Sequence, residues 1–473
     1  MLSVKDNELM CRVGPGTPMG NLLREYWIPA MTPDDLTRDG PPLRIRLLGE
    51  NLIAFQQTSG AYGLIQNSCP HRGASMFFGR NEEDGLRCVY HGWKFDTTGA
   101  CVDMPSEPAE SNFKNKVRTR AYPCVERNGV VWTYMGARTE PPPLPDLPPN
   151  QDPACTALRR MQECNYMQAL EGDIDTVHAG FLHLGHLDAA RDFLRGGPEY
   201  YGIKQREARF EAYEHEIGAT YAAVRPAETG TEYWRTGHFL MPFWTMNAPG
   251  VMPHKNSATA WVPLDDEHTL IWNIGPRGQR GMGPETVGIG GLHAGAFLTS
   301  EPMSPNDPYP RRVVGQQLGT LQRMFLEDTS DWLGRFRAIA NAGNDYMIDR
   351  QLQADMEKDP TKPLRGTYSG IPQVAQDPMV QESMGPVYDR SQEHLGTSDS
   401  MLIRARRKLI NAAKAYEENG TLPPGVEKPE LYRMRSGGAI LPEGVDGMKA
   451  LREVHFFRSD TPDLGIEVLV QTS

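Results

Sequence analysis

A proline-rich stretch limits what this sequence can fold into. The segment from Thr139 to Pro149 reads TEPPPLPDLPP. Proline fixes φ and has no amide hydrogen to donate, so this stretch cannot join a helix or a central strand. We therefore expect an extended linker over residues 139–153. It would separate an N-terminal domain (1–138) from a C-terminal domain (154–473).

The patterns on the two sides of this linker differ. Before it, runs such as LRIRLLG, NLIAFQQ, AYGLIQN and VVWTYMG carry β-branched and aromatic residues between turn residues, which predicts strands. After it, strand-like runs such as YWRTGHFLMPFWTMN and TAWVPLDDEHTLIWNI, the second a hairpin turning at Asp265–Asp266, alternate with helical patterns. The clearest helix is expected from Thr397 to Gly420. The prediction is an α+β chain with an all-β first domain.

Composition excludes several classes of protein. The net charge of −11 over 473 residues argues against general nucleic-acid binding, which requires a basic surface. No apolar run is long enough to span a bilayer, and the start MLSVKDNELM lacks the secretory pattern, so we expect a cytoplasmic protein. The chain has seven cysteines, an odd number, and they are spread over its length. This argues against a disulfide framework.

Two Cys–His pairs lie in the segment CPHRGASMFFGRNEEDGLRCVYHGW: Cys69 with His71, and Cys88 with His91. Four such ligands can close a tetrahedron around one zinc ion, or they can hold a [2Fe–2S] cluster with two Cys on one iron and two His on the other. The C-x-H spacing is tighter than that of a usual zinc knuckle. The surrounding residues CPHRGA and CVYHGWKFD are similar to the cluster loops of Rieske proteins, which favours the cluster, with Trp93 as a screen against water.

The same loops indicate the kind of Rieske protein. Respiratory-chain members carry an additional Cys in each loop, joined as a disulfide, whereas this sequence has Ala74 and Tyr90 at those positions. The chain therefore resembles the low-potential Rieske proteins that deliver electrons to oxygenases. A Rieske cluster transfers single electrons and makes no bonds itself, so an enzyme would need a second site.

The segment EGDIDTVHAGFLHLGH supplies a candidate for that second site. It contains Asp175, His178 and His183 as D-x2-H-x4-H. His178 would lie one helical turn beyond Asp175, and His183 could converge with it if the helix bends or ends near Gly180. Two imidazoles and one carboxylate leave ferrous iron open positions for dioxygen. A histidine pair that only packs in a helix is the alternative interpretation.

Together the two motifs resemble one family, the Rieske-type aromatic-ring-hydroxylating oxygenases, and within it the phthalate-dioxygenase-like group. Segments such as RVGPGTPMGNLLREYWIPA, LRCVYHGWKFD and VDMPSEP carry this similarity. The resemblance implies a Rieske domain followed by a catalytic domain with an antiparallel sheet of helix-grip type and C-terminal helices. Family members often carry Glu-Asn before the Asp, whereas this sequence has Glu171-Gly172, so we expect that a side-chain amide near the iron is missing.

The resemblance also implies a third iron ligand far downstream, in a pattern like E-D-x4-E. The segment QDPMVQES offers Asp377, with Gln376 in place of the usual preceding acid. Asp345, Asp349 and Asp389 are competing carboxylates, which can equally be surface groups or helix caps.

The resemblance further implies how the sites cooperate. Subunits would pack head to tail as a trimer or a dimer of trimers, with Asp175 linking His178 to His91 of a neighbour. The alternative is that Asp175 only fixes the tautomer of His178 in its own chain. The sequence has no dinucleotide-binding G-x-G-x-x-G after a strand and no plant-type cluster motif. Electrons from NAD(P)H would therefore reach this chain through a separate reductase, directly or through a ferredoxin, to activate O2.

The substrate is expected to be an aromatic carboxylate. Arg209 and Arg235 are candidates to bind its carboxylate, although each can equally be a surface arginine paired with glutamate. An apolar pocket could include residues of the FWTM segment, namely Phe243, Trp244 and Met246. The Gly- and Pro-rich insert near 281–315 could border a pocket or a subunit contact. Ring hydroxylation and oxidative O-demethylation of a methoxylated, lignin-derived acid stay open, and a non-catalytic electron carrier or redox sensor is a remote alternative.

Overall fold

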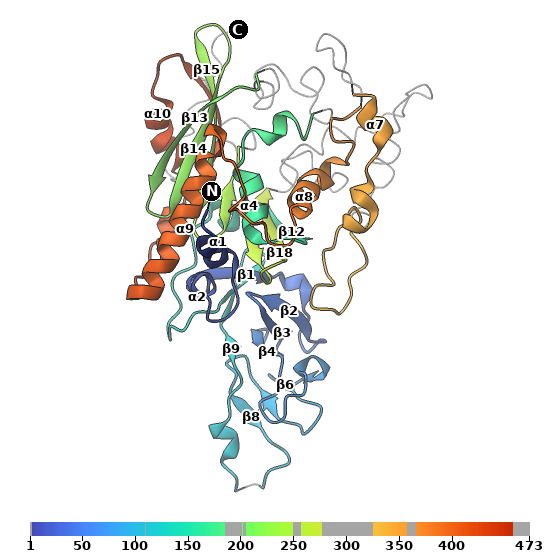
Figure 1. The fold of residues 1–473 in the computed structure, drawn as a ribbon. Helices are drawn as coiled ribbons and strands as arrows, with labels where there is room; N and C mark the ends of the chain where they lie inside the picture. The colour runs from blue at the N-terminus through green and yellow to red at the C-terminus, as the bar shows by residue number, and fades with distance from the viewer. Residues whose placement is uncertain are drawn as a thin grey trace.

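The computed structural model describes residues 2–108, 110–184, 201, 205–248, 257–276, 325–356 and 366–456. A small β-rich part lies at one end of the molecule, and a larger part of sheet and helices lies at the other (Figure 1). The chain is thus an all-β domain followed by an α+β domain, as predicted. The insert near 281–315 lies outside the described residues.

The β-rich part consists of two four-stranded sheets and a three-stranded sheet. Its predicted strands are confirmed: LRIRLLG, NLIAFQQ, AYGLIQN and VVWTYMG correspond to β2, β3, β4 and β11, with β3 beginning one residue earlier, at Glu50. One sheet has the order β2 (Leu43–Leu47), β3 (Glu50–Gln56), β4 (Tyr62–Gln66), β9 (Ala121–Tyr122). The second runs β5 (Arg80–Asn81), β6 (Leu86–Arg87), β7 (Lys94–Phe95), β8 (Cys101–Asp103), and the third runs β1 (Trp27–Met31), β11 (Val130–Tyr134), β10 (Cys124–Arg127).

The larger part is built on an eight-stranded antiparallel sheet. The predicted hairpin forms β17 and β18 in register from Pro263 opposite Thr269. The run YWRTGHFLMPFWTMN makes two strands rather than one, because proline at Met241–Pro242 interrupts the ladder. The strand order is β12 (Cys155–Gln162), β18 (Thr269–Pro276), β17 (Ala258–Pro263), β16 (Trp244–Met246), β15 (Thr231–Leu240), β14 (Gly218–Pro226), β13 (Arg209–His215), with β19 (Gly437–Pro442) also pairing with β15.

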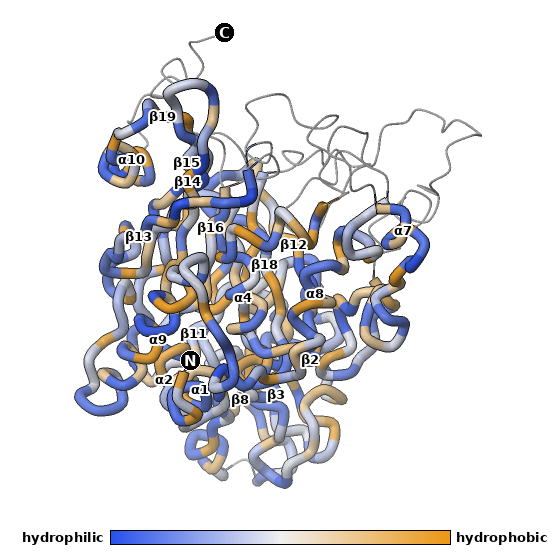
Figure 2. Tube along the Cα trace, turned by 45° about the horizontal axis from the view of Figure 1, so that its top comes forward, coloured by the Kyte–Doolittle hydropathy of each residue, from blue (hydrophilic) through white to orange (hydrophobic). Residues whose placement is uncertain are grey.

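Helices cover this sheet. The expected C-terminal helix is confirmed as α9 (Ser400–Asn419), which ends at Gly420 in the left-handed conformation that glycine adopts without strain. Figure 2 shows hydrophobic residues along β12 and β18 in the middle of the molecule. Helices α4 (Tyr166–Ile174) and α8 (Gln373–Ser383) contact each other beside these strands, whereas α7 (Arg350–Ala354) and α10 (Gly447–His455) lie further out (Figure 1).

The N-terminal helices pack against the C-terminal part of the chain. Helices α1 (Val4–Cys11) and α2 (Pro18–Arg24) pack on α9, and Lys414 forms an ion pair with Asp6 at 2.7 Å. Their apolar side chains share one core with α4 and the large sheet. A separate small core contains both cysteines of the Cys–His pairs. The predicted domain limits of 1–138 and 154–473 stay a prediction, but the first helices pack on α9 across the 138 limit.

The proline-rich stretch is more ordered than a free linker. Pro142, Pro145 and Leu147 are buried, and the Pro142 carbonyl accepts a hydrogen bond from Trp27 Nε1 at 2.6 Å. The stretch leads into a one-turn helix, α3 (Pro148–Gln151). The expectation that it joins no helix was wrong at this end, because proline is tolerated in the first turn, where its missing N–H would be unpaired anyway.

Candidate metal centres

The two Cys–His loops share one backbone fold although their spacings differ. In the first, the Cys69 N–H donates to the Ala74 carbonyl at 2.8 Å and the Gly73 N–H donates to the Cys69 carbonyl at 2.9 Å. In the second, Cys88 and Gly92 make the equivalent bonds, to Trp93 at 2.9 Å and to Cys88 at 3.0 Å. Gly73 and Gly92 both have φ of +77°, a region that other residues adopt only with strain. These two glycines therefore allow the tight turn in each loop.

The cysteine and histidine side chains of these loops differ in their exposure to solvent. Cys69 and Cys88 are 3% and 2% exposed, whereas His71 is exposed and its ring lies 4.4 Å from that of His91. Trp93 stacks on His71 at 4.4 Å, which is the position expected of a screen. Burial raises the pKa of the Cys69 thiol to about 11, so a bound metal must displace its proton.

The spread of these four ligands suits two metal ions rather than one. A tetrahedral zinc site needs donor atoms within about 4 Å of one another. In the described part of the chain, only one group of three or more candidate ligands has its atoms within 4.8 Å of one another, and it contains none of these four residues. Two buried thiols and two outer imidazoles fit a [2Fe–2S] cluster with Cys on one iron and His on the other.

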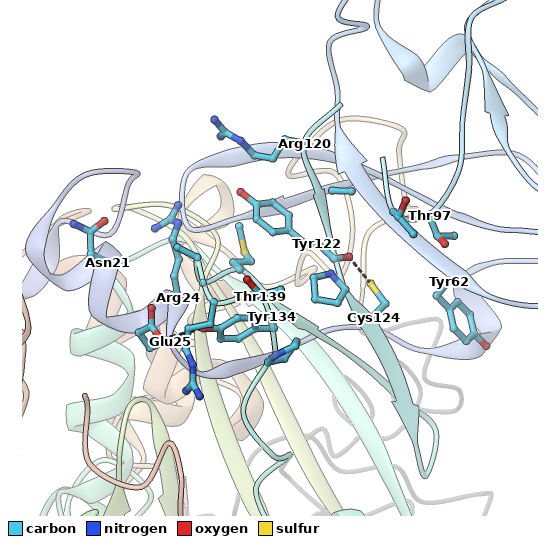
Figure 3. A pocket seen from close by; sticks show the side chains of 18 of the residues that line it. Asn21, Arg24, Glu25, Tyr62, Thr97, Arg120, Tyr122, Cys124, Tyr134 and Thr139 are labelled. Carbon is cyan, nitrogen blue, oxygen red and sulfur yellow. Dashed lines mark hydrogen bonds between the residues drawn. The ribbon is translucent and has the colours of Figure 1, made fainter. Parts of the chain in front are cut away.

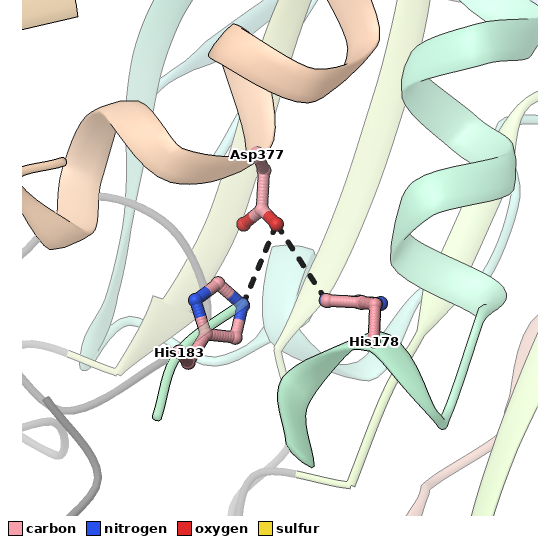
Figure 4. A group of neighbouring side chains, drawn as sticks. All are labelled: His178, His183 and Asp377. Carbon is pink, nitrogen blue, oxygen red and sulfur yellow. Dashed lines mark ion pairs between the residues drawn. The ribbon is translucent and has the colours of Figure 1, made fainter. Parts of the chain in front are cut away.

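That one group is His178, His183 and Asp377 (Figure 4). His178 Nε2 and His183 Nε2 lie 3.5 Å and 3.4 Å from the same carboxylate oxygen of Asp377. His183 is 1% exposed, and its buried Nε2 has no hydrogen-bond partner in the part of the chain that the structure describes. A buried imidazole nitrogen with a free lone pair, beside a second imidazole and a carboxylate, fits a divalent metal such as ferrous iron.

The local fold that presents the histidines differs from the expected helix. Helix α4 ends at Ile174, so Asp175 is its C-cap rather than a residue one helical turn before His178. The Asp175 carboxylate accepts from the Val177 N–H at 2.7 Å and lies 3.5 Å from His178 Nδ1. A short 3-10 turn, His178–Gly180, then leads to His183. The helix thus ends before the first histidine, and the turn made by Asp175 brings the two rings together.

Electrostatics favours the ionised carboxylate of Asp377, whereas it favours the protonated form of His178, whose proton a bound metal must displace. Burial alone would raise the pKa of Asp377, but His183 and His178 outweigh it and hold the pKa well below its usual range. Burial lowers the pKa of His178, and Asp175 and Asp377 more than compensate, so its pKa is raised. Asp377 is therefore ionised at neutral pH and ready to serve as a ligand.

Gln376, which sequence reasoning noted only as a missing acid, orients His183. It is fully buried, and its Oε1 lies 2.5 Å from His183 Nδ1. Its Nε2 donates to Ser369 Oγ at 2.7 Å and to the Ile371 carbonyl at 3.1 Å. Because both amide hydrogens are committed, the carbonyl end must face the imidazole, so His183 Nδ1 carries the hydrogen and Nε2 is free for a metal.

The competing carboxylates lie elsewhere. Asp345 and Asp389 are exposed, and Asp349 accepts the Gln351 and Leu352 N–H groups as the N-cap of α7. The structure brings Asp377, and none of these three, to the two histidines.

A cavity opens beside the triad, between α4, α8 and the inner face of the large sheet. The triad residues His178 and Asp377 line it together with Arg235, and so does Arg160, which the sequence reasoning did not single out. Alternation along β12 turns Arg160 to this face, where its Nη1 donates to the Val374 carbonyl at 2.8 Å. Its remaining walls include Leu158, Asn247, Thr259, Trp261, Ile271 and Asn273.

The two predicted substrate arginines have different places. Arg235 has no hydrogen-bond or ion-pair partner among the described residues, and it lines the cavity. Arg209 lies half-exposed, bonded to Glu232 at 2.9 Å and paired with Glu211, which is the surface role weighed as its alternative. The apolar candidates Phe243, Trp244 and Met246 are core residues, at most 1% exposed, and they do not line the cavity.

A second, more open hollow lies near β9, β10 and α2 (Figure 3). Its charged groups already have partners: Arg24 and Arg120 pair with Glu50, Arg138 pairs with Glu427, and Glu25 accepts from Tyr134 at 3.0 Å. We assign it no chemistry.

Comparisons with known proteins agree with this geometry. A model described as Rieske [2Fe-2S] domain matches residues 26–123, and one described as LigXa C-terminal domain like matches residues 133–288 and 318–456. A cluster domain joined to such a catalytic domain defines the class of Rieske non-haem iron oxygenases. In the crystal structure of dicamba monooxygenase bound to 3,6-dichlorosalicylic acid, 18% identical, the fold agrees with a TM-score of 0.52 over 84% of this chain and 100% of that one.

Three relatives indicate which members of this class the chain resembles in sequence. The 3-chlorobenzoate-3,4-dioxygenase oxygenase subunit of Comamonas testosteroni is 42% identical over 94% of this chain and 97% of its own. The phthalate 4,5-dioxygenase oxygenase subunit of Pseudomonas putida is 32% identical over 94% of each. The 5,5'-dehydrodivanillate O-demethylase oxygenase subunit of a Sphingobium species is 37% identical over 56% of this chain and 61% of its own.

This chain belongs to the Rieske-type aromatic-ring-hydroxylating oxygenases, as an oxygenase subunit, and the predicted family is confirmed. It is an oxidoreductase with a Rieske [2Fe–2S] cluster, a mononuclear iron and dioxygen as co-substrate. None of the helices in the described ranges has the length and apolar character needed to cross a membrane.

Proposed function

We propose that this subunit hydroxylates an aromatic carboxylate, using O2 and electrons that a separate reductase takes from NAD(P)H. The observation that carries this proposal is the position of Arg235, a guanidinium to which the described residues offer no partner, in the wall of the cavity that His178 and Asp377 also line. A cavity-facing arginine matches the planar geometry of a carboxylate.

In this proposal His178 Nε2, His183 Nε2 and the Asp377 carboxylate hold Fe(II), and Cys69, Cys88, His71 and His91 hold the cluster. The bound iron supplies the reduction of dioxygen that precedes hydroxylation. The protein contributes three things: it fixes the tautomer of His183 through Gln376, it keeps Asp377 ionised, and it anchors the substrate at Arg235.

We further propose that Asp175 links the two sites between subunits. Its carboxylate lies 3.5 Å from His178 Nδ1 and stays 31% exposed, so it can accept a second donor from outside the chain. His91 is partly exposed on the cluster loops, which lie in the other part of the molecule (Figure 1). A head-to-tail trimer, or a dimer of trimers, would bring His91 of one subunit to Asp175 of the next.

The experiment is a screen of aromatic acids, plain and methoxylated, with a generic reductase, in which oxygen uptake is matched to product mass. A gain of two oxygens and two hydrogens would support dihydroxylation. A loss of a methylene unit would support oxidative O-demethylation of a methoxylated aromatic acid, the second candidate, favoured by the demethylase relative and compatible with the same iron site. No turnover of any aromatic acid, with both metals loaded, would refute the proposal. A plain electron carrier would have no use for the buried triad.

A further inference from the structure

A second glutamine of α8 lies beside the proposed iron site. Gln381 follows Asp377 by one helical turn, so the two side chains point to the same side of the helix. Gln381 is 5% exposed and lines the same cavity as His178 and Asp377. Its side chain therefore faces the space in which a substrate would bind, not the solvent.

In the structure this amide is oriented against a neighbour on β12. Gln162, which is fully buried, donates a hydrogen bond from Nε2 to Gln381 Oε1. The carbonyl end of Gln381 is thereby turned to β12, and its Nε2 end points toward α4. Gln168 of α4 also donates to the Gln381 backbone carbonyl at 3.0 Å, which holds the two helices together at this level.

Gly172 leaves the room that the amide occupies. It lies inside α4, where glycine weakens a helix and so calls for a packing reason. A Cβ at this position would overlap Gln381 Nε2 well inside van der Waals contact. The side-chain amide expected to be missing because of Gly172 is therefore replaced, in the same space, by one from α8.

The Nε2 group of Gln381 has hydrogens to donate. Within the described ranges, the structure gives it no acceptor, and the cavity is the open side of the group. A donor that is nearly buried needs an acceptor, and leaving it unpaired is unfavourable.

We propose that Gln381 determines substrate specificity by donating a hydrogen bond from Nε2 to an oxygen on the ring of the bound aromatic acid. This inference rests on the proposed function, in which Arg235 holds the carboxylate. It assigns the site to aromatic acids that carry a second oxygen acceptor, namely another carboxylate, a hydroxyl or a methoxy group. An acid with no such oxygen would leave the amide unpaired.

The test compares benzoate with phthalate and with the isomeric hydroxy- and methoxybenzoates. Their binding to the purified oxygenase is measured by calorimetry, with and without iron loading, so that the result does not depend on turnover. The best oxygen-bearing acid is expected to bind about ten- to a hundredfold more tightly than benzoate. Gln381→Leu should reduce this ratio to about one, while the affinity for benzoate changes little.

Gln381→Glu provides a second variant with nearly unchanged shape. It keeps an oxygen for Gln162 but presents an acceptor to the cavity, so it should bind phthalate and the methoxybenzoates, whose second oxygens only accept, more weakly than benzoate. Gln392→Leu, at an exposed glutamine on a loop after α8, is the control and should leave the ratio unchanged. The inference is overturned if Gln381→Leu keeps the wild-type ratio. If the wild type binds no aromatic acid, the proposed substrate class fails first, and that result differs from a loss of selectivity.

A separate test addresses whether a side chain at position 172 and the Gln381 amide compete for the same space. Gly172→Ala should lower the denaturation midpoint of the iron-free protein, and Gln381→Ala in the same chain should restore most of it, because it removes the overlapping amide. Additive effects of the two substitutions would contradict the shared space.

Discussion

Gln376 offers the sharpest test of the proposed iron site, because every hydrogen bond of its amide is accounted for. Its carbonyl oxygen faces His183 Nδ1 at 2.5 Å, and its two hydrogens are held by Ser369 and Ile371. Gln376→Met keeps the approximate volume and removes all three bonds. His183 is 1% exposed, so its Nδ1 hydrogen would then be buried without an acceptor.

The size of the effect expected of Gln376→Met follows from the burial of His183. Leaving a buried donor unsatisfied costs about 1–3 kcal/mol, and we expect the free energy of unfolding of the iron-free protein to fall by this amount. The freed imidazole can also rotate or change tautomer, and the loss of such an outer partner weakens metal binding by about 10–100-fold. The cluster loops contain none of these residues, so the visible absorbance of the cluster should not change.

The assay measures iron affinity by competition with a chelator and stability by urea unfolding of the iron-free protein. Gln392→Met, at an exposed glutamine outside the site, is the matched control. Gln376→Asn is too short to reach both sides and should fall between the wild type and Gln376→Met. If Gln376→Met binds iron as tightly as the wild type, the amide does not fix the tautomer, and our reading of the site is wrong.

Three further predictions follow from the same structure. Asp377→Ala should leave the cluster absorbance intact and abolish retention of the mononuclear iron, as metal analysis would show; retained iron would point to another carboxylate. Asp175→Asn should keep both metals yet abolish coupled turnover, because the proposed link to a neighbouring subunit is a carboxylate, and normal product formation would exclude that link. Burial lowers the pKa of His238 to about 4, against about 6.5 in the unfolded chain, so its contribution to stability is present above pH 6.5 and is lost as the pH falls toward 4. The loss of stability amounts to about 3 kcal/mol. The urea midpoint should therefore change less between pH 7.5 and pH 4.5 in His238→Gln than in the wild type. An equal change in the two proteins would refute the role of His238.

Much of the candidate site was predictable because its ligands lie close together in sequence. Cys69 with His71, and Cys88 with His91, each come from one tight loop whose glycine turn is a local property. Asp175, His178 and His183 fall in one segment, although the local structure there is a helix end and a 3-10 turn rather than a continuous helix. Asp377 was named by resemblance, since nothing in the local sequence marks it as a ligand.

The sequence by itself determined the chemistry available: the cluster ligands, the histidine pair and the division into a β part and an α+β part. The tertiary structure decided which distant groups meet them. Gln376 reaches His183 across 193 residues of chain, a contact that only the packing of α8 beside α4 creates. Register decided between the two arginines: Arg235 lies opposite Ala223 and Arg209 opposite Val224, neighbours that point to opposite faces of the sheet. A shift of one residue exchanges the faces of a strand, so which arginine faces the cavity depends on the pairing that the folded sheet adopts.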